Sequence, residues 1–344
     1  MNTVNAGKVV SLLIMNLFLI CFYSNGEYSK ISNGDFWYDT DGNKIDAHGG
    51  GVVKVDDTYY WFGEVMYKPK KESVVIKCYS SKDLKTWKFE NDVITSKTPG
   101  FESCAHLQRL KVIYNSSTSQ YVLWGHWEIN PWGKVEHAVV ATCSEVAGDY
   151  EFVKHFEPTD LAKDCTLFKD DDGTAYFIFA SGNHKDLILC RLTKDYLDID
   201  QVVNADMITE IEREAPAVFK RNGIYYLFTS GCSGWGPNQQ KYSTATSIVG
   251  PWSEHLNIGN KNGYRTQTHF VLPVEGADET TYLYLGDRYL DPTISSPKNI
   301  WLPIEWKGDV PCLNYYDSWW IDVSTGKWID VKIEKQDPSC ELIF

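Results

Sequence analysis

The sequence predicts an all-β fold, a five-bladed β-propeller, and two observations lead to this prediction. One hairpin pattern recurs five times at a spacing of about 50 to 60 residues, and helical periodicity is scarce throughout the 344 residues. Three or four strands per repeat, five times over, are typical of a propeller, whose blades pack face to face around an axis. The alternative is a β-sandwich or two irregular β domains, but sandwiches rarely repeat one hairpin pattern at near-constant spacing.

Each repeat consists of an apolar strand, a polar turn and a strand rich in aromatic residues. The five hairpins fall at residues 51–62, 111–124, 166–179, 217–228 and 270–285. Asp-Gly and Asn-Gly turns, as at 172–173 and 222–223, favour hairpins because glycine accepts the positive φ of tight turns. Further strands follow each hairpin, and residues 318–328 are expected to complete the fifth blade. We expect one propeller domain, residues 27–344, without a linker or second domain.

Residues 1–26 are predicted to be a secretory signal peptide. Lys8 precedes an apolar run at 9–22, and small polar residues follow this run. An uncleaved membrane anchor is the alternative, but the run is short for a span of roughly 20 residues. We therefore expect a secreted, extracellular protein that has no membrane contact after cleavage.

Charge and composition limit the partners. The formal net charge of −13 argues against nucleic acid and anionic membranes, since both bind basic surfaces. Eight of the nine cysteines lie outside the signal, and an even number in an exported protein permits disulfides. Asn115 begins an Asn-Ser-Ser glycosylation sequon at an expected hairpin turn. We expect a glycoprotein that is a monomer.

Polar residues recur at one phase of the repeat, directly before the first strand of each blade. They are His48, Gln108, Asp164, Glu214 and Gln267, spaced 60, 56, 50 and 53 residues apart. Because first strands line the axis of a propeller, we expect these side chains to form a ring at one mouth of the channel. Charged groups are costly to bury, so their position before apolar strands indicates a function. Structural hydrogen bonding of the rim is the alternative.

Two carboxyl groups of this ring indicate glycoside hydrolysis. Asp164 and Glu214 in one partly dehydrated pocket would push each other's pKa values apart, so that one stays protonated near neutral pH. Glycosidases need an acid that protonates the leaving oxygen and a second group that acts on water. Trp132 and Trp235, near expected loops, are candidates for stacking on sugar faces, although packing is the more common role of such residues.

Several blocks of the sequence resemble glycoside hydrolase family 43, and most of all its exo-β-1,3-galactanase branch. The blocks are residues 47–51, 60–64, 109–115, 166–176, 214–217 and 242–247, and the similarity extends from about residue 30 to 330. This resemblance implies a five-bladed propeller that inverts the anomeric carbon. It also implies a galactose-containing substrate, β-1,3-linked galactan, the backbone of type II arabinogalactan.

The resemblance assigns roles to individual residues. Glu214 is the expected general acid, and Asp164 is expected to tune its pKa and orient it. Gln267 takes the place of a glutamine that positions water, because the galactanase branch lacks the usual aspartate base. Inversion requires the acid and the water-positioning group to lie roughly 6.5–9.5 Å apart. Glu64 resembles a residue that holds hydroxyl groups of the terminal galactose.

One residue departs from the pattern. Gln108 stands where the branch usually carries a glutamate, so an amide replaces a carboxylate that contacts the sugar. His48 is a further candidate for contacting the sugar, with a structural role as the alternative. We expect no cofactor and no catalytic metal, and a structural calcium ion in the channel near His48 stays open. Arabinofuranosidase or xylosidase activity, and glycan binding without cleavage, are the alternative functions.

Overall fold

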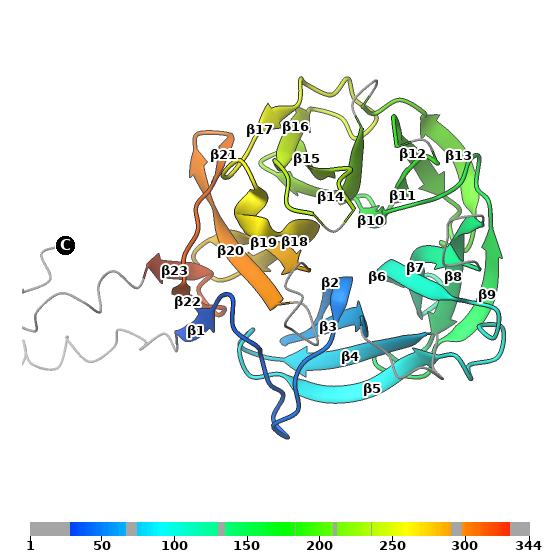
Figure 1. Ribbon diagram of the computed structural model, residues 1–344, viewed down its shortest axis with the longest axis horizontal. Coiled ribbons are helices and arrows are strands. Elements are labelled where there is room, and N and C mark those ends of the chain that lie inside the picture. Colours follow the sequence, from blue (N-terminus) through cyan, green and yellow to red (C-terminus); the bar gives the residue numbers. More distant parts are fainter. Residues whose placement is uncertain are drawn as a thin grey trace, which may run out of the picture.

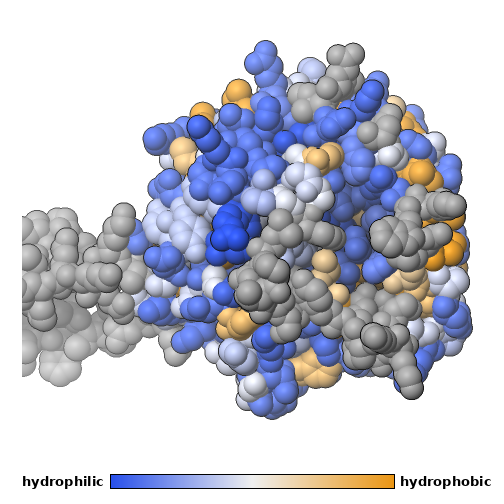
Figure 2. All heavy atoms as spheres, in the orientation of Figure 1, coloured by the Kyte–Doolittle hydropathy of each residue, from blue (hydrophilic) through white to orange (hydrophobic). Residues whose placement is uncertain are grey.

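The computed structural model describes residues 28–66, 74–129, 135–182, 184–208, 212–234, 236–289 and 298–330. Five antiparallel sheets of four strands surround a central axis, and a sixth sheet of three strands lies beside them (Figure 1). One short 3-10 helix, η1 (Gly263–Arg265), is present in these residues. Viewed along the axis, the described surface is mainly hydrophilic, with hydrophobic side chains scattered over it (Figure 2).

The strands of each four-stranded sheet follow one another in chain order. The first two sheets are β2 (His48–Val55), β3 (Thr58–Glu64), β4 (Val75–Ser81), β5 (Lys88–Thr95), and β6 (His106–Asn115), β7 (Gln120–Glu128), β8 (Glu136–Cys143), β9 (Glu151–Phe156). The third is β10 (Cys165–Lys169), β11 (Ala175–Ala180), β12 (Leu187–Leu192), β13 (Ile199–Asn204). The fourth is β14 (Arg213–Arg221), β15 (Ile224–Gly231), β16 (Lys241–Ala245), β17 (Leu256–Asn257). The fifth is β18 (Gln267–Glu275), β19 (Thr280–Arg288), β20 (Lys298–Lys307), β21 (Val310–Leu313).

The first strand of each four-stranded sheet lies nearest the axis. β2, β6, β10, β14 and β18 pack against one another in that order, and β18 closes the ring against β2. Apolar side chains fill the spaces between neighbouring sheets: Phe62 and Trp127 between the first and second, and Tyr226 and Tyr284 between the fourth and fifth. Face-to-face burial of this kind provides most of the stability of a propeller.

The sixth sheet shows that the prediction of a five-bladed propeller is wrong: the described residues form six sheets. β22 (Ser318–Asp322) pairs on one side with β1 (Ser29–Ser32) and on the other with β23 (Lys327–Asp330). Residues 318–328 therefore do not complete the fifth four-stranded sheet, whose outer positions belong to β20 and β21. Ile31 and Trp319 bury their side chains against tryptophans of the first and fifth sheets, which joins the sixth sheet to the rest.

The five hairpins predicted from the repeat are confirmed as the pairs β2–β3, β6–β7, β10–β11, β14–β15 and β18–β19. The predicted signal peptide lies outside the described residues and stays a prediction. Among the described residues, no helix has the length and apolar character needed to cross a bilayer. No disulfide joins any pair of the seven described cysteines.

Candidate active site

A bulge interrupts the first strand of four sheets at the same place. The pairing register shifts after His48 in β2, Gln108 in β6, Glu214 in β14 and Thr268 in β18. The next residue in three of these strands has a positive φ: 64° at Gly49, 53° at Arg109 and 52° at Ala215. A bulge turns side chains away from the regular alternation of a strand. The repeated bulge therefore helps to set the direction of His48, Gln108 and Glu214, three of the five residues that the sequence analysis selected by their phase.

A pocket of about 220 Å³ opens at this level. Its described lining comes from the second to the fifth sheets and from the loops beside them. The lining residues are Gln108, Arg109, His126, Glu128, Glu136, Lys163, Asp164, His184, Glu214, Gly234 and Gln267. Four of the five residues predicted to form a ring, Gln108, Asp164, Glu214 and Gln267, thus meet in one pocket.

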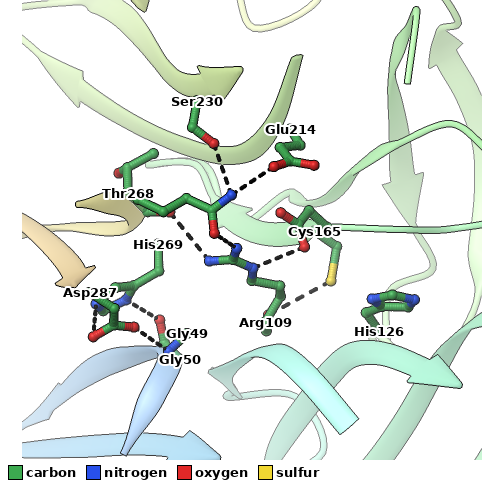
Figure 3. Close-up of polar contacts among 12 residues, drawn as sticks. Gly49, Gly50, Arg109, His126, Cys165, Glu214, Ser230, Thr268, His269 and Asp287 are labelled. Atoms are coloured by element: carbon green, nitrogen blue, oxygen red, sulfur yellow. Dashed lines mark hydrogen bonds and ion pairs between the residues drawn. The ribbon is translucent and has the colours of Figure 1, made fainter. Parts of the chain in front are cut away.

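Arg109 organises the floor of the pocket through hydrogen bonds (Figure 3). The guanidinium donates from Nε to Asp164 Oδ1 at 3.0 Å and from a terminal nitrogen to Gln267 Oε1. A third bond, 3.4 Å long, goes to the carbonyl oxygen of Thr268. Arg109 is only 2% exposed, and the charge of Asp164 offsets the cost of burying its guanidinium.

Gln267 links this network to Glu214. Its Nε2 donates to Glu214 Oε1 at 2.8 Å and to Ser230 Oγ at 3.1 Å. The expected separation of roughly 6.5–9.5 Å between acid and water-positioning group is therefore wrong for this structure, because the two side chains are in direct contact. Glu214 Oε2 points elsewhere, 3.7 Å from His184 Nδ1.

The two carboxyl groups have opposite pKa shifts. Burial, and then the negative charge of Asp164, raise the pKa of Glu214 to about 8. Burial alone would also raise the pKa of Asp164, but the charge and hydrogen bond of Arg109 lower it below its ordinary value. Near neutral pH, Glu214 therefore holds a proton while Asp164 is ionised, as the sequence analysis expected for a glycosidase.

One wall of the pocket comes from β7, β8 and the residue before Asp164. His126 and Glu128 project from the same face of β7, and Glu136 of β8 pairs directly with Glu128. Lys163 Nζ lies 3.6 Å from Glu136 Oε2. Burial lowers the pKa of His126 to about 4, so this imidazole is neutral over most of the pH range.

His48 and Glu64 are absent from the described lining of the pocket. His48 is fully buried, with Nε2 2.8 Å from Asp46 Oδ1 and Nδ1 3.5 Å from Asp287 Oδ1. Glu64, 2% exposed, pairs with His48 across β2 and β3. This position favours the structural role for His48. Trp132 and Trp235 lie outside the described residues, so their predicted stacking stays a prediction.

Asn115 ends β6 next to a turn, as expected for the sequon. Its side chain is 2% exposed, and Nδ2 donates to the carbonyl oxygen of Lys194 at 2.8 Å. A glycan on Nδ2 would have to displace this contact. Glycosylation at Asn115 stays a prediction.

Two groups of side chains in the described residues have spacings compatible with a metal ion. One contains His184, Glu214 and Cys232, and the other contains His126, Glu128 and Glu136; within each group the ligand atoms lie within 4.8 Å of one another. Neither group contains His48, near which the sequence analysis left a calcium ion open. The expectation that catalysis needs no metal stays a prediction.

Sequence reasoning missed Arg109, His126, His184, Lys163 and Glu136. A signal existed for Arg109, because it follows Gln108 directly and so lies at the bulge. His126 could have been found through pairing, since it lies opposite Gln108 across β6 and β7. The other three depend on loop and sheet geometry that the repeat pattern does not contain.

A β-propeller whose polar pocket holds two buried carboxyl groups with opposite pKa shifts has the site expected of a glycoside hydrolase. The chain belongs to glycosyl hydrolases family 43, whose family model matches residues 46–309. The resemblance noted in the sequence is therefore confirmed.

Similar solved structures include two exo-β-1,3-galactanases. That from Clostridium thermocellum is 38% identical, with a TM-score of 0.83 over 88% of this chain and 68% of that chain. That from Phanerochaete chrysosporium, solved with galactose, is 32% identical, with a TM-score of 0.81 over 88% of this chain and 71% of that chain. A β-D-galactofuranosidase, xynD of Aspergillus niger, is 33% identical over 144 residues, 38% of this chain. The matched segment spans 39% of that curated relative.

Proposed function

We propose that this protein is an inverting, exo-acting glycosidase that hydrolyses β-1,3-linked galactan. The observation that carries the proposal is the pairing of a protonated Glu214 with an ionised Asp164 in one pocket. Similarity to two exo-β-1,3-galactanases over 88% of the chain supports galactan as the substrate.

Glu214 acts as the general acid. Its Oε1 accepts a hydrogen bond from Gln267 Nε2, so the acidic proton resides on Oε2. Oε2 lies on the side of His184, another residue that lines the pocket. The glycosidic oxygen of the substrate would accept this proton from Oε2 as the bond to the anomeric carbon breaks.

Asp164 keeps Glu214 protonated and is itself kept charged by Arg109. Its negative charge disfavours ionisation of Glu214, and the guanidinium disfavours protonation of Asp164. Asp164 also favours the positive charge that develops at the anomeric carbon in the transition state. In this scheme Asp164 neither gives nor takes a proton.

Gln267 positions the attacking water. Its two Nε2 hydrogens are used by Glu214 and Ser230, and its Oε1 accepts from Arg109. A carbonyl oxygen has two lone pairs, so Oε1 can accept one more hydrogen bond, from water. An amide cannot take up a proton near neutral pH, so Gln267 orients the water without acting as its base. The proton that the water loses as it bonds to the anomeric carbon passes to solvent, and solvent later returns a proton to Glu214.

The galactofuranosidase similarity favours a second candidate substrate, a β-D-galactofuranoside. The five-membered ring would bring the same anomeric carbon chemistry to Glu214. We give it the second place because the matched segment covers only 38% of this chain.

The test is incubation of the purified protein with linear β-1,3-galactan and, separately, with nitrophenyl β-D-galactofuranoside. We expect free galactose from galactan, released first as the α-anomer and detected by NMR. The Glu214→Gln variant should bind galactan and release nothing. Binding of galactan without galactose release by the unsubstituted protein would instead support a non-catalytic glycan-binding propeller.

Export of a monomer is part of the proposal. The apolar run at 9–22 supports a cleaved signal peptide. The net charge of −13 supports a soluble monomer after export, because molecules of like charge repel one another. Expression with and without residues 1–26, followed by sizing of the secreted protein, tests both. Unchanged activity in EDTA is expected if catalysis uses no metal.

A further inference from the structure

His126 has a buried imidazole that faces the pocket without a hydrogen bond. The residue is 4% exposed and lines the pocket, and neither Nδ1 nor Nε2 has a hydrogen-bond partner in the described structure. The nearest acidic atom, Glu128 Oε1, lies 3.7 Å from Nε2, beyond hydrogen-bonding distance. Figure 3 shows His126 beside the Arg109 network with no contact drawn to it.

Such an arrangement costs stability unless a ligand completes it. A donor or acceptor that gives up its hydrogen bonds to water on burial destabilises the folded state unless the protein or a ligand replaces them. Most buried side-chain polar atoms in folded proteins are therefore hydrogen-bonded. Nearby, Arg109, Asp164, Glu214 and Gln267 satisfy one another. Glu136 Oε2, on the same wall, is also buried without a hydrogen bond, but Lys163 Nζ lies 3.6 Å from it. His126 differs because both of its ring nitrogens lack a hydrogen bond.

The chemistry of the imidazole indicates what it binds. A neutral imidazole offers one N–H donor and one nitrogen acceptor, and a sugar hydroxyl is both a donor and an acceptor. His126 in β7 lies opposite Gln108 in β6, and Gln108 lines the same pocket. We propose that His126 is a substrate-binding residue that hydrogen-bonds a hydroxyl group of the bound galactosyl unit. This inference rests on the proposed function, because it takes the ligand of the pocket to be a sugar.

A metal ion is the competing ligand, because His126, Glu128 and Glu136 have ligand atoms within 4.8 Å of one another. The structure favours the sugar, since Lys163 already places an ammonium group 3.6 Å from Glu136 Oε2. A divalent cation bound to Glu136 would be repelled by this charge.

Binding is tested in the Glu214→Gln protein, so that turnover does not affect the measurement. Calorimetric titration with β-1,3-galactobiose should show an affinity roughly 5- to 100-fold lower when His126→Phe is added. His126→Gln, which restores a donor and an acceptor, should recover part of the loss. His137→Phe is the matched control, because His137 lies on the neighbouring strand outside the described lining and should leave the affinity unchanged.

Two further measurements separate binding from a structural role. Without sugar, His126→Phe should melt at the same or a higher temperature than its parent, since an unbonded polar group has been replaced by an apolar ring. Among monodeoxy galactosides, one should bind less tightly to the parent than galactose does, and this difference should vanish in His126→Phe.

Several results would overturn the inference. Unchanged galactobiose affinity in His126→Phe, in a protein that cleaves galactan, contradicts it and leaves the proposed function intact. A large fall in melting temperature with an unchanged deoxy series would show a structural role. Loss of binding in EDTA with recovery on addition of Zn²⁺ would identify the ligand as a cation. Absence of both sugar binding and galactan cleavage contradicts the proposed function and this inference together.

Discussion

Glu214 combines two properties that an acid catalyst needs, a proton near neutral pH and a defined oxygen that holds it. Burial and the charge of Asp164 provide the first, and the hydrogen bond from Gln267 to Oε1 provides the second. Neither property belongs to the glutamate alone. Changes at its neighbours should therefore alter the pH dependence of activity without removing the acid itself.

The pH profile of the unsubstituted enzyme follows from these shifts. Activity should fall as pH rises through about 8, where Glu214 loses its proton, and should persist at acidic pH because Asp164 stays ionised below its ordinary pKa. The raised pKa of Glu214 also implies that the contribution of this residue to stability is greatest at low pH and declines between its unfolded value, 4.5, and about 8. Measured kcat/KM from pH 4 to 10 checks the first statement. The second predicts that Glu214→Gln unfolds at a higher urea concentration than the parent at pH 8.5, and equal midpoints would contradict it.

Asp164→Asn should move the alkaline limb of the profile. Removing the negative charge lowers the pKa of Glu214, so the decline in kcat/KM should begin at a lower pH than in the parent. The rate should also fall, by roughly 100-fold or more, because a charge that stabilises the transition state is lost. Glu157→Gln removes a negative charge at an exposed position seven residues earlier and is the control for charge. An unshifted alkaline limb would show that Asp164 does not control the proton of Glu214.

Gln108→Glu tests the residue that departs from the galactanase pattern. A carboxylate at this place in the pocket would accept charge-assisted hydrogen bonds from sugar hydroxyls, which are about twice as strong as neutral ones. We expect KM for galactan to fall several-fold and the alkaline limb to move upwards, because a further negative charge favours the protonated form of Glu214. Steady-state kinetics over the same pH range measure both. A higher KM would show that the amide suits this pocket better than the carboxylate.

At the scale of the strands, the bulges of the inner ring connect sequence phase to site geometry. In β2 the bulge contains Gly49 and Gly50, which need glycine for different reasons. Gly49 has a φ of +64°, but an added Cβ would have no neighbour nearer than 3.6 Å. At Gly50 an added Cβ would lie 1.8 Å from the carbonyl oxygen of Phe62 in β3. Glycine is therefore favoured at position 49 by the backbone conformation and at position 50 by the lack of space for a Cβ.

Alanine at each position should separate these two causes. Gly49→Ala should lower the free energy of unfolding by about 1–2 kcal/mol, the cost of a left-handed conformation for a residue with a Cβ. Gly50→Ala should cost at least about 3 kcal/mol, because β2 and β3 must move apart. Urea unfolding of both variants gives the comparison. Equal losses would mean that the bulge relaxes to make room at Gly50.

The bulges also explain how much of the site could be predicted. Repeat phase alone located Gln108, Asp164, Glu214 and Gln267, because an inner strand starts at the same level in each sheet. Phase could not show that Arg109 would join Asp164 to Gln267, since alternation alone would turn a residue next to Gln108 away from the pocket. Nor could it show that Gln267 and Glu214 would touch, because that contact depends on how closely β14 and β18 pack.

At the scale of the whole molecule, the repeat predicted the five hairpins but not the number of sheets. β1 has four residues, lies ahead of the first repeat and carries no hairpin signal. Its pairing with β22, in which Ser32 lies opposite Ser318, 286 residues later, therefore left no trace in a local pattern. β20 and β21 occupy the outer positions that seemed open to residues 318–328. Local sequence patterns predict the pairing of strands that are neighbours in the chain, whereas the pairing of β1 with β22 depends on how the sheets pack.

That packing makes a final prediction about the cohesion of the fold. Ile31 of β1 is 1% exposed and belongs to one apolar cluster with Trp61, Trp301 and Trp319, which come from the first, fifth and sixth sheets. Ile31→Ala should therefore lower the free energy of unfolding by about 2–5 kcal/mol in a single transition, because the cavity lies where three sheets meet. Lys30→Ala, on the other face of the same strand, should change it little. Calorimetry and galactose release measured together decide the outcome. If the sixth sheet melts first while activity persists, this sheet is an accessory layer, and the five sheets around the pocket stay folded without β1, β22 and β23.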